Sequence, residues 1–417
     1  MEMKILHINT SQVGGAAWCA IRLCKALVQS GVDSRMLFGE GKTLPDGIDG
    51  DIAYPDKHCW QSIPILRSVI YRLLPKIPFF INQRKLQKLL NEANESHLYL
   101  HQPFSNYKNI GHHPLVEWAD IIHLHWVADF VDYPTFFKEV KKPIVWTLHD
   151  KYPAVGIQHF CSEFYPVPDN LQYIDDLCTK IKRKSVSRSD QLHIVAISEQ
   201  MVDLCRNSNV LKGLPITSIY NGVDVNIFTP YDKQEARKEL GLLLDATIFL
   251  YSSYWLHDYN KGLIRTVRAL EKIAIPNKIL ICIGGGSSVP MPNASLPIIL
   301  TGMLNNQSKI AKYYSATDFF LQSSLEETFA QAPIESMACG TPVISTPCSG
   351  ATDLINKDNG IVCEDFTVDS LEKGIMLALS RNYNREKIRE DIITRFSYDK
   401  IANQYINLYN TVLKGKK

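Results

Sequence analysis

Two acidic side chains, Glu327 and Glu335, are separated by seven residues in the stretch SSLEETFAQAPIESMACGTP. The residues between them predict the start of a short helix, whose free backbone N–H groups near 328–332 favour an anion such as a diphosphate. A carboxylate beside bound phosphate is repulsive unless it accepts hydrogen bonds from sugar hydroxyls. The stretch therefore points to a sugar-phosphate ligand, although a solvated loop glutamate and an ordinary first-turn helix glutamate fit the residues equally well.

Histidines and an acid stand at the ends of two expected strands in the first half of the chain. His123 and His125 fall on the same face of the strand at 121–124, because side chains alternate along a strand. His125 is the terminal one, and α/β sheets bind ligands at the carboxyl ends of their strands. We expect His123 to be a hydrogen-bonded histidine of the core rather than a residue of the site. The next strand ends at His149 and Asp150, for which we expect acceptor-side or loop-positioning roles.

These side chains depend on strands that alternate with helices, a pattern that predicts parallel sheets covered on both faces. The expected strands are 4–9, 121–124, 144–147, 194–197, 216–220, 247–252, 278–283, 297–300, 318–322 and 342–345. The expected helices include 16–30, 232–240 and 262–273. A chain of 417 residues is too long for one core, so we expect two doubly wound domains in tandem, with a cleft between them.

The bulk composition is that of an ordinary globular protein. Hydrophobic residues make up 45% and charged residues 21%, and the formal net charge of +2 favours no nucleic-acid partner. The ten cysteines show no CxxC pair and are expected as reduced core thiols. The N-terminus has no signal-peptide pattern, and no stretch has the length of a membrane span. We therefore expect a cytoplasmic protein, at most peripheral at the inner face of the plasma membrane.

Six short stretches follow one another in a characteristic order, although each alone is a weak signal. They are Gly14-Gly15, His123-Leu124-His125, Ala196-Ile197-Ser198, Asn221-Gly222-Val223-Asp224, Lys261-Gly262 and the glutamate pair followed by SMACGTPVIS. Because these six stretches occur in this order, the chain resembles family 4 of the retaining glycosyltransferases over most of its length. The resemblance implies the GT-B fold, an α/β architecture of two Rossmann-like doubly wound domains that face a central cleft.

The resemblance also implies an activity. Such an enzyme moves a sugar from a UDP- or GDP-linked donor to a glycan or lipid-linked acceptor in cell-surface polysaccharide synthesis, with retention of configuration. It implies no cofactor and no metal, because a lysine and a helix N-terminus supply the positive charge. Two alternatives stay open: a different enzyme on the same scaffold, such as an epimerase or a phosphorylase, and a non-catalytic partner that binds sugar nucleotides.

The family's roles carry over to residues of the second half. The resemblance implies that Glu335 holds the ribose hydroxyls and that Glu327 contacts the hydroxyls of the donor sugar. The N–H groups of Thr328 and Phe329 face sugar and phosphate. Lys261 neutralises the diphosphate, whose negative charge grows as it departs. Glu327 and Lys261 thus belong to the expected catalytic set.

In the first half, the resemblance implies that the backbone at Gly14 and Gly15 approaches the same diphosphate, where a side chain would block it. It implies that His125, the third expected catalytic residue, touches the donor sugar near the reaction centre. One departure concerns a Gly-Arg pair that the family usually places before Lys261, where this chain has SSYW. Arg265, four residues beyond Lys261, either replaces that arginine as a phosphate ligand or is a surface charge.

The turn at 221–222 and the charged helix start at 232, after 228–230, place a domain boundary there. We expect an acceptor-side domain at 1–228 and a nucleotide-sugar-binding domain at 229–387. The last helix, 388–417, has no strand after it and is expected to pack across the domain junction. A basic stretch at 61–90 contains six cations and no acid, interleaved with apolar residues: Arg67, Arg72, Lys76, Arg84, Lys85 and Lys88. It is either a peripheral contact with an anionic membrane, which would suit a lipid-linked acceptor, or the solvated face of a helix pair.

Overall fold

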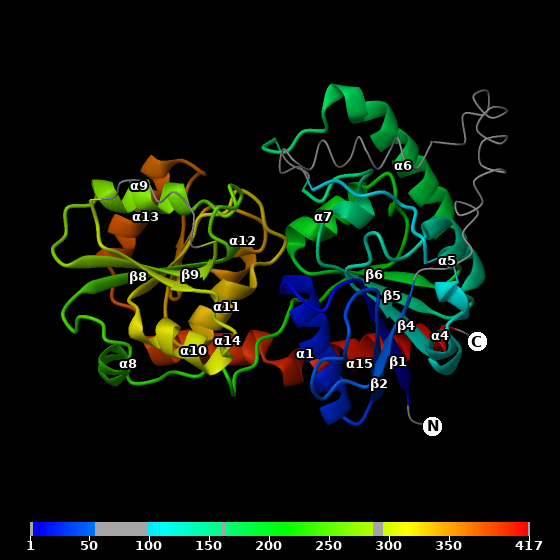
Figure 1. Cartoon of the computed structure of the whole chain (residues 1–417), viewed down its shortest axis with the longest axis horizontal. Helices are drawn as coiled ribbons and strands as arrows, with labels where there is room; N and C mark the ends of the chain where they lie inside the picture. Colours follow the sequence, from blue (N-terminus) through cyan, green and yellow to red (C-terminus); the bar gives the residue numbers. More distant parts are fainter. Residues whose placement is uncertain (1–2, 55–98, 108, 161–162, 287–294, 416–417) are drawn as a thin grey trace. The chain divides into compact units, whose positions relative to one another are not determined.

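The computed structural model describes residues 3–54, 99–107, 109–160, 163–286 and 295–415. The basic stretch at 61–90 lies outside the described residues. The chain divides into two compact units (Figure 1). The first comprises 1–196, 201–217 and 406–417, and the second comprises 197–200 and 218–405.

The first unit is built on a seven-stranded sheet with the order β3-β2-β1-β4-β5-β6-β7. Its strands are β1 (Lys4–Asn9), β2 (Asp33–Phe38), β3 (Gly50–Ile52), β4 (Ile121–Leu124), β5 (Ile144–Leu148), β6 (Leu192–Ala196) and β7 (Ile216–Ser218). Its helices are α1 (Gly15–Gln29), α4 (Pro114–Trp118), α5 (Tyr133–Glu139), α6 (Gln172–Val186) and α7 (Glu199–Asn207). The pairings of β1 through β6 are parallel, as the alternation of strands and helices predicts.

The two faces of this sheet differ in chemistry. Leu6, Ile8 and Leu124 pack into a large apolar core with α5, and Figure 1 shows α5, α6 and α7 on that side. The alternate positions carry His7 and His123, which pair in register on β1 and β4. They point to the opposite face, which α1 and the end of the C-terminal helix cover (Figure 1). The polar residues of the strands are therefore gathered on one side.

The second unit is built on a six-stranded parallel sheet with the order β10-β9-β8-β11-β12-β13. Its strands are β8 (Thr247–Trp255), β9 (Lys278–Gly285), β10 (Ile298–Gly302), β11 (Phe319–Gln322), β12 (Val343–Ser345) and β13 (Gly360–Val362). Its helices are α8 (Lys233–Glu239), α9 (Leu263–Lys272), α10 (Gln307–Ala316), α11 (Gln331–Ala338), α12 (Ala351–Leu354), α13 (Val368–Leu379) and α14 (Arg385–Phe396). Figure 1 shows α9 and α13 on one face of this sheet and α10, α11 and α14 on the other. The predicted α/β class, with two doubly wound sheets, is confirmed.

The single C-terminal helix expected from residue 388 onward is wrong, because two helices form. The first, α14, ends at Phe396, and the second, α15, runs over Tyr398–Lys414. Ser397 between them is extended, with ψ of 146°, and forms an isolated parallel bridge with Val223. That bridge takes Ser397 out of the helical conformation and so breaks the continuous helix. Residues of α15 up to Tyr405 belong to the second unit, and those from Ile406 belong to the first.

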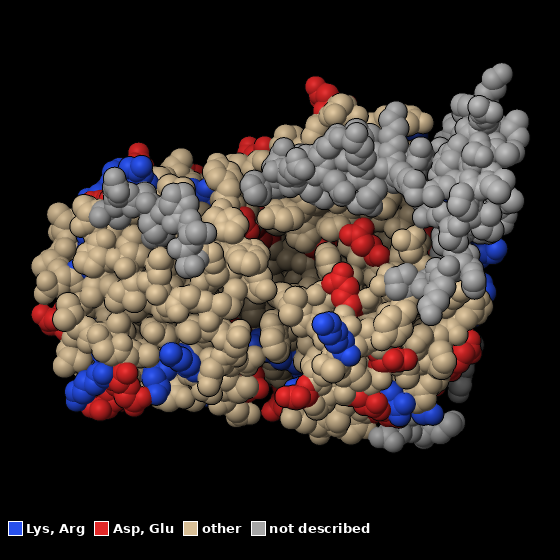
Figure 2. Space-filling view, in the orientation of Figure 1, with Lys and Arg blue, Asp and Glu red and all other residues tan. Residues whose placement is uncertain are grey.

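Charged side chains of both signs are interspersed on the face drawn in Figure 2, and the described residues there form no continuous basic field. This distribution agrees with 45 basic against 43 acidic residues in the chain. Among the helices of the described ranges, none is long and apolar enough to cross a membrane.

Candidate functional site

Three adjacent strands of the second unit, β8, β11 and β12, each lead into a helix that no side chain of the described residues caps. The helices α9, α11 and α12 follow Gly262, Ala330 and Gly350, whose φ angles are 79°, 65° and 80°. Four other helices of the same unit are capped by side chains, those of Asp232, Asn306, Thr367 and Asn384. The first N–H groups of an uncapped helix lack intrahelical partners. This edge of the sheet therefore offers backbone donors to an anion.

Lys261 and Glu327 meet at this edge. Lys261 Nζ lies 2.6 Å from Glu327 Oε1, and the side chains are 30% and 13% exposed. Burial lowers the pKa of Lys261, but the Glu327 carboxylate and its hydrogen bond outweigh this effect and raise the pKa overall. The ammonium is thus held charged, at the margin of solvent, where a phosphate could reach it.

Two further side chains hold the Glu327 carboxylate. The Gln322 amide donates to Glu327 Oε1 at 3.1 Å, and the Ser324 hydroxyl donates to the same oxygen at 2.8 Å. Neither residue was predicted from the sequence. Their positions in the sequence could have indicated them, because Gln322 ends β11 and Ser324 precedes Glu327 by three residues. Three donors on one oxygen fix the carboxylate in a single orientation.

The loop that carries Lys261 is fastened to the loop that carries Glu327. The Asn260 amide donates to Glu326 O at 2.8 Å, and Glu326 N–H donates back to Asn260 Oδ1 at 2.9 Å. Arg265 donates to Ser323 O at 2.9 Å and to Asn260 O at 3.0 Å. Its guanidinium therefore binds backbone carbonyls and joins the two loops, a role that neither expectation for this residue included.

Glycines allow this close approach. A Cβ added to Gly262 would lie 2.3 Å from Ser323 O, and its φ of 79° is in the left-handed region. A Cβ added to Gly350 would lie 2.5 Å from the Cα of Phe329. The Phe329 side chain is buried and packs with Tyr220 and Phe396. Its side chain is therefore taken up by the core, and the backbone of Phe329 is the part left for a ligand.

The helix after the glutamate loop begins later than the sequence suggests. The expected donors lay near 328–332, whereas α11 begins at Gln331, so Thr328 and Phe329 belong to the loop. Ala330 has a positive φ, a conformation that is uncommon for a residue with a Cβ. Glu335 is half-buried on the second turn of α11.

Gly14 and Gly15 lie in the first unit at the start of α1. Gly14 has a φ of 95°, and a Cβ added to either glycine would meet no atom within 4 Å. No side chain of the described ranges caps α1. The start of this fifteen-residue helix is therefore open, as the expected approach of a phosphate requires.

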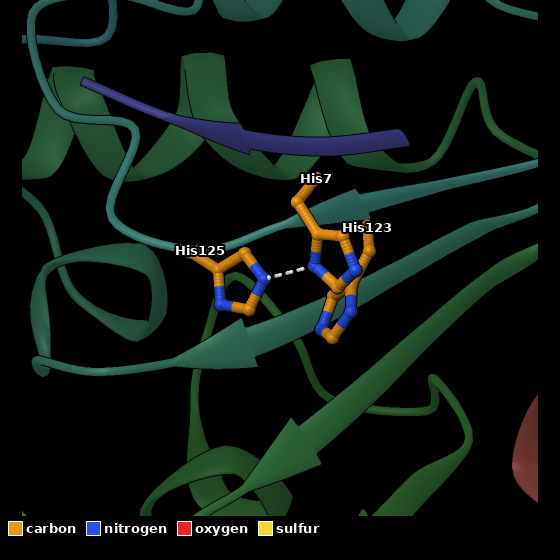
Figure 3. A group of neighbouring side chains, drawn as sticks. All are labelled: His7, His123 and His125. Carbon is orange, nitrogen blue, oxygen red and sulfur yellow. Dashed lines mark hydrogen bonds between the residues drawn. The ribbon is translucent and has the colours of Figure 1, made fainter. Parts of the chain in front are cut away.

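The histidines of the first unit form a hydrogen-bonded group on the polar face of its sheet. His125 Nε2 lies 2.8 Å from His7 Nδ1 (Figure 3). His125 Nδ1 lies 3.0 Å from His149 Nε2. His123 bonds the Tyr409 hydroxyl and the Thr147 hydroxyl, each at 2.7 Å, and is the core histidine that we expected. His7 was not among the residues predicted from the sequence, because it is 118 residues from His125 along the chain.

Burial keeps these imidazoles neutral. It lowers the pKa of His7 to about 3 and that of His149 to about 4, and it lowers the pKa of His125 well below its usual value. Ligand atoms of His7, His123 and His125 lie within 4.8 Å of one another, a spacing that a metal ion could use. However, both nitrogens of His123 have hydroxyl partners, and its ring lies 4.1 Å from that of His125, centroid to centroid, at 34°. Overlapping rings do not direct their in-plane lone pairs at one point, so the hydrogen bonds account for the cluster.

The carboxylate of Asp150 contacts other side chains than the one that His149 contacts. Its carboxylate accepts from Trp126 Nε1 at 2.7 Å and lies 2.9 Å from His159 Nδ1. Burial raises the pKa of Asp150, but the His159 and Trp126 contacts outweigh it, and the pKa is lower than usual. A half-exposed pair, His101 and Asp129, lies beside them, with His101 Nδ1 2.9 Å from Asp129 Oδ2. The ends of β4 and β5 thus carry hydrogen-bonding groups beside aromatic rings.

Comparison with known proteins decides the family. The model described as Glycosyltransferase Family 4 matches residues 13–227, and that described as Glycosyl transferases group 1 matches residues 232–395. The chain belongs to glycosyltransferase family 4. It is therefore a glycosyltransferase.

Three known proteins are similar to this glycosyltransferase. An uncharacterized glycosyltransferase of Methanocaldococcus jannaschii is 24% identical over 320 residues, 72% of this chain and 77% of that protein. A putative teichuronic acid biosynthesis glycosyltransferase of Bacillus subtilis is 23% identical over 228 residues, 53% of this chain and 56% of that protein. The structure of HepE from Anabaena in complex with UDP-glucose is 17% identical with a TM-score of 0.67, and covers 98% of this chain and all of that one. The last likeness shows the GT-B fold.

Proposed function

We propose that this glycosyltransferase binds a nucleoside-diphosphate sugar at the edge formed by β8, β11 and β12 and transfers the sugar with retention of configuration. The observation that carries the proposal is the Lys261–Glu327 pair among uncapped helix N-termini. The ammonium and the backbone N–H groups suit a diphosphate, and a carboxylate fixed on one oxygen suits sugar hydroxyls. The UDP-glucose complex of the structurally similar HepE supports a donor of this class.

In the proposed reaction, the acceptor hydroxyl attacks the anomeric carbon on the face from which the diphosphate departs. The bond between the anomeric carbon and the phosphate oxygen breaks, and the departing phosphate takes the proton of the attacking hydroxyl. Lys261 and the first N–H groups of α9 and α11 stabilise the charge that grows on the diphosphate. Glu327 accepts hydrogen bonds from the donor sugar, while Gln322 and Ser324 keep it in place. No metal or cofactor takes part in this scheme.

Replacement of Glu335 tests the nucleotide position. We expect Glu335→Ala to weaken binding of a nucleoside diphosphate by roughly 10- to 100-fold, because ribose hydroxyls lose a charged acceptor worth about 1.5–3 kcal/mol. Isothermal calorimetry with UDP and with GDP measures the change and identifies the base. Glu390→Ala, an exposed glutamate on α14, is the matched control and should bind normally. If a folded Glu335→Ala variant binds the nucleoside diphosphate with unchanged affinity, the nucleotide does not bind at α11.

We further propose that the first unit takes a glycan or lipid-linked acceptor, with His149 and Asp150 on the acceptor side, in cell-surface polysaccharide synthesis in the cytoplasm. The similarity to the putative teichuronic acid glycosyltransferase supports an acceptor of this class. The polar and aromatic groups at the ends of β4 and β5 support a ligand rich in hydroxyls.

A lipid-linked acceptor would suit a peripheral membrane contact through the basic stretch at 61–90. If the six cations of that stretch face anionic lipid, each contributes about 1 kcal/mol, and reversal of three should nearly abolish vesicle binding. Cosedimentation with anionic and neutral vesicles, at low and high salt, measures this contact. Donor hydrolysis should survive the reversal, because the proposed donor site is in the second unit. Native protein that stays in the supernatant with both vesicles would favour a soluble acceptor.

A further inference from the structure

The imidazoles of His7, His125 and His149 form a chain of two hydrogen bonds that starts in the core and ends at a half-buried residue. The contacts are His7 Nδ1 to His125 Nε2 at 2.8 Å and His125 Nδ1 to His149 Nε2 at 3.0 Å. In Figure 3 the His7 and His125 rings meet edge to edge at the dashed bond. His7 and His125 are buried, and His149 is half-buried. A ligand could therefore reach the chain at His149.

Neutral imidazoles impose one direction on such a chain. A neutral ring carries one proton and one lone pair, so the middle ring donates to one neighbour and accepts from the other. In one arrangement His7 donates to His125, which donates to His149. In the other arrangement every proton is reversed, and His7 carries its proton on Nε2.

The surroundings of His7 select between the two arrangements. Nε2 of His7 is buried and has no hydrogen-bond partner within the described ranges. In the reversed arrangement this atom is an N–H buried without an acceptor, which is rare in native proteins and costs more than an unused lone pair. His7 therefore carries its proton on Nδ1, and so do His125 and His149.

The middle ring is also held by the backbone. His125 N–H donates to Ile8 O at 3.0 Å, and Trp146 Nε1 donates to His125 O at 3.1 Å. These bonds tie the residue to the neighbouring strands on both sides. Both ring nitrogens of His125 are engaged by His7 and His149, so neither is open in this arrangement to the donor-sugar contact that the resemblance implies for His125. His125 therefore acts on a ligand through His149.

We infer that His7 and His125 are positioning residues that hold His149 in its Nδ1–H tautomer, with Nε2 turned toward His125. A free neutral histidine prefers the opposite tautomer, with the proton on Nε2, so the chain enforces the less common form. His149 then carries an N–H rather than a lone pair at Nδ1. The tautomer stands on geometry alone, and only its use on the acceptor side rests on the proposed function.

The direct test is a long-range ¹H–¹⁵N spectrum of the full chain labelled with ¹⁵N-histidine, at neutral pH. We expect His7, His125 and His149 each to show the pattern of a neutral ring protonated on Nδ1. A native His149 protonated on Nε2 would overturn the inference. A titration with Zn²⁺ in the same experiment addresses the metal alternative, because a stoichiometric shift of both His7 and His125 would make the cluster a metal centre and also overturn it.

Variants of His7 test the coupling along the chain. His7→Phe removes the first donor, and His149 should move toward the Nε2–H form. His7→Asn places an amide N–H where Nδ1 was and should preserve the native pattern. His193→Phe is the control, because His193 bonds Thr217 and belongs to no part of the chain. If His7→Phe folds and leaves the His149 tautomer unchanged, the positioning role fails, and if it does not fold, the native spectrum decides.

Donor cleavage supplies a second readout. With a donor sugar nucleotide identified by thermal shift, His7→Phe should lower kcat by about tenfold, within the roughly 10²-fold that misplacement of a group at the site can cost, with KM within about twofold. His7→Asn should recover most of this loss. An inactive native enzyme would count against the proposed function, while the spectrum would still report the tautomers.

Discussion

Lys261→Ala should lower the rate of donor cleavage by about 10²–10³, with the fold unchanged. One preorganised group on the developing charge of a leaving group is worth about that much. Lys261 is the cation that contacts Glu327 among the uncapped helix N-termini, and no other ammonium contacts Glu327 in the described part of the chain. Single-turnover hydrolysis of the sugar nucleotide separates the chemical step from binding.

Lys272→Ala is the matched control for this variant. Lys272 lies on α9, as the last residue of the helix that Lys261 precedes, but pairs with Asp369 and Glu372 on the surface. Its loss should leave the rate within about twofold, since exposed ion pairs contribute about 0–1 kcal/mol to stability and this one is remote from the proposed site. A fully active Lys261→Ala would place the diphosphate elsewhere in the molecule.

Gly262→Ala should destabilise the second unit by about 3 kcal/mol, the sum of left-handed backbone strain and of overpacking against a neighbouring loop. The added Cβ would lie 2.3 Å from Ser323 O and 2.5 Å from the Arg265 guanidinium. Ser323 O is also the acceptor of Arg265, so the loops that carry Lys261 and Glu327 should separate and donor cleavage should fall as well. Urea unfolding at equilibrium measures the loss of stability.

Gly241→Ala separates strain from crowding. Gly241 has a φ of 67° in the same unit, and a Cβ added there would meet nothing within 4 Å. This variant should lose only about 1 kcal/mol, the left-handed strain alone, and should keep its activity. If Gly262→Ala and Gly241→Ala lose the same free energy of unfolding, the contact between Gly262 and Ser323 O is not tight.

The class of fold and its repeated units could be predicted from the sequence because the signals are local. Alternating strands and helices, and the Gly14-Gly15 pair before the helix expected at 16–30, each lie within a few residues of the element that they define. Element ends were less certain. β8 and β9 extend beyond their expected ends, and α14 stops where Ser397 pairs with Val223, a contact between residues far apart in the chain.

By itself the sequence determined which residues of the candidate donor site could do chemistry, since Lys261, Glu327 and Glu335 lie in short stretches with characteristic neighbours. It did not determine what those residues touch. The Lys261–Glu327 pair is separated by 66 residues, and the His7–His125 pair by 118. Their contacts depend on the order and register of parallel strands, which connections over many residues set. Only the tertiary structure could therefore show that Arg265 joins two loops and that His7 forms a hydrogen bond with His125.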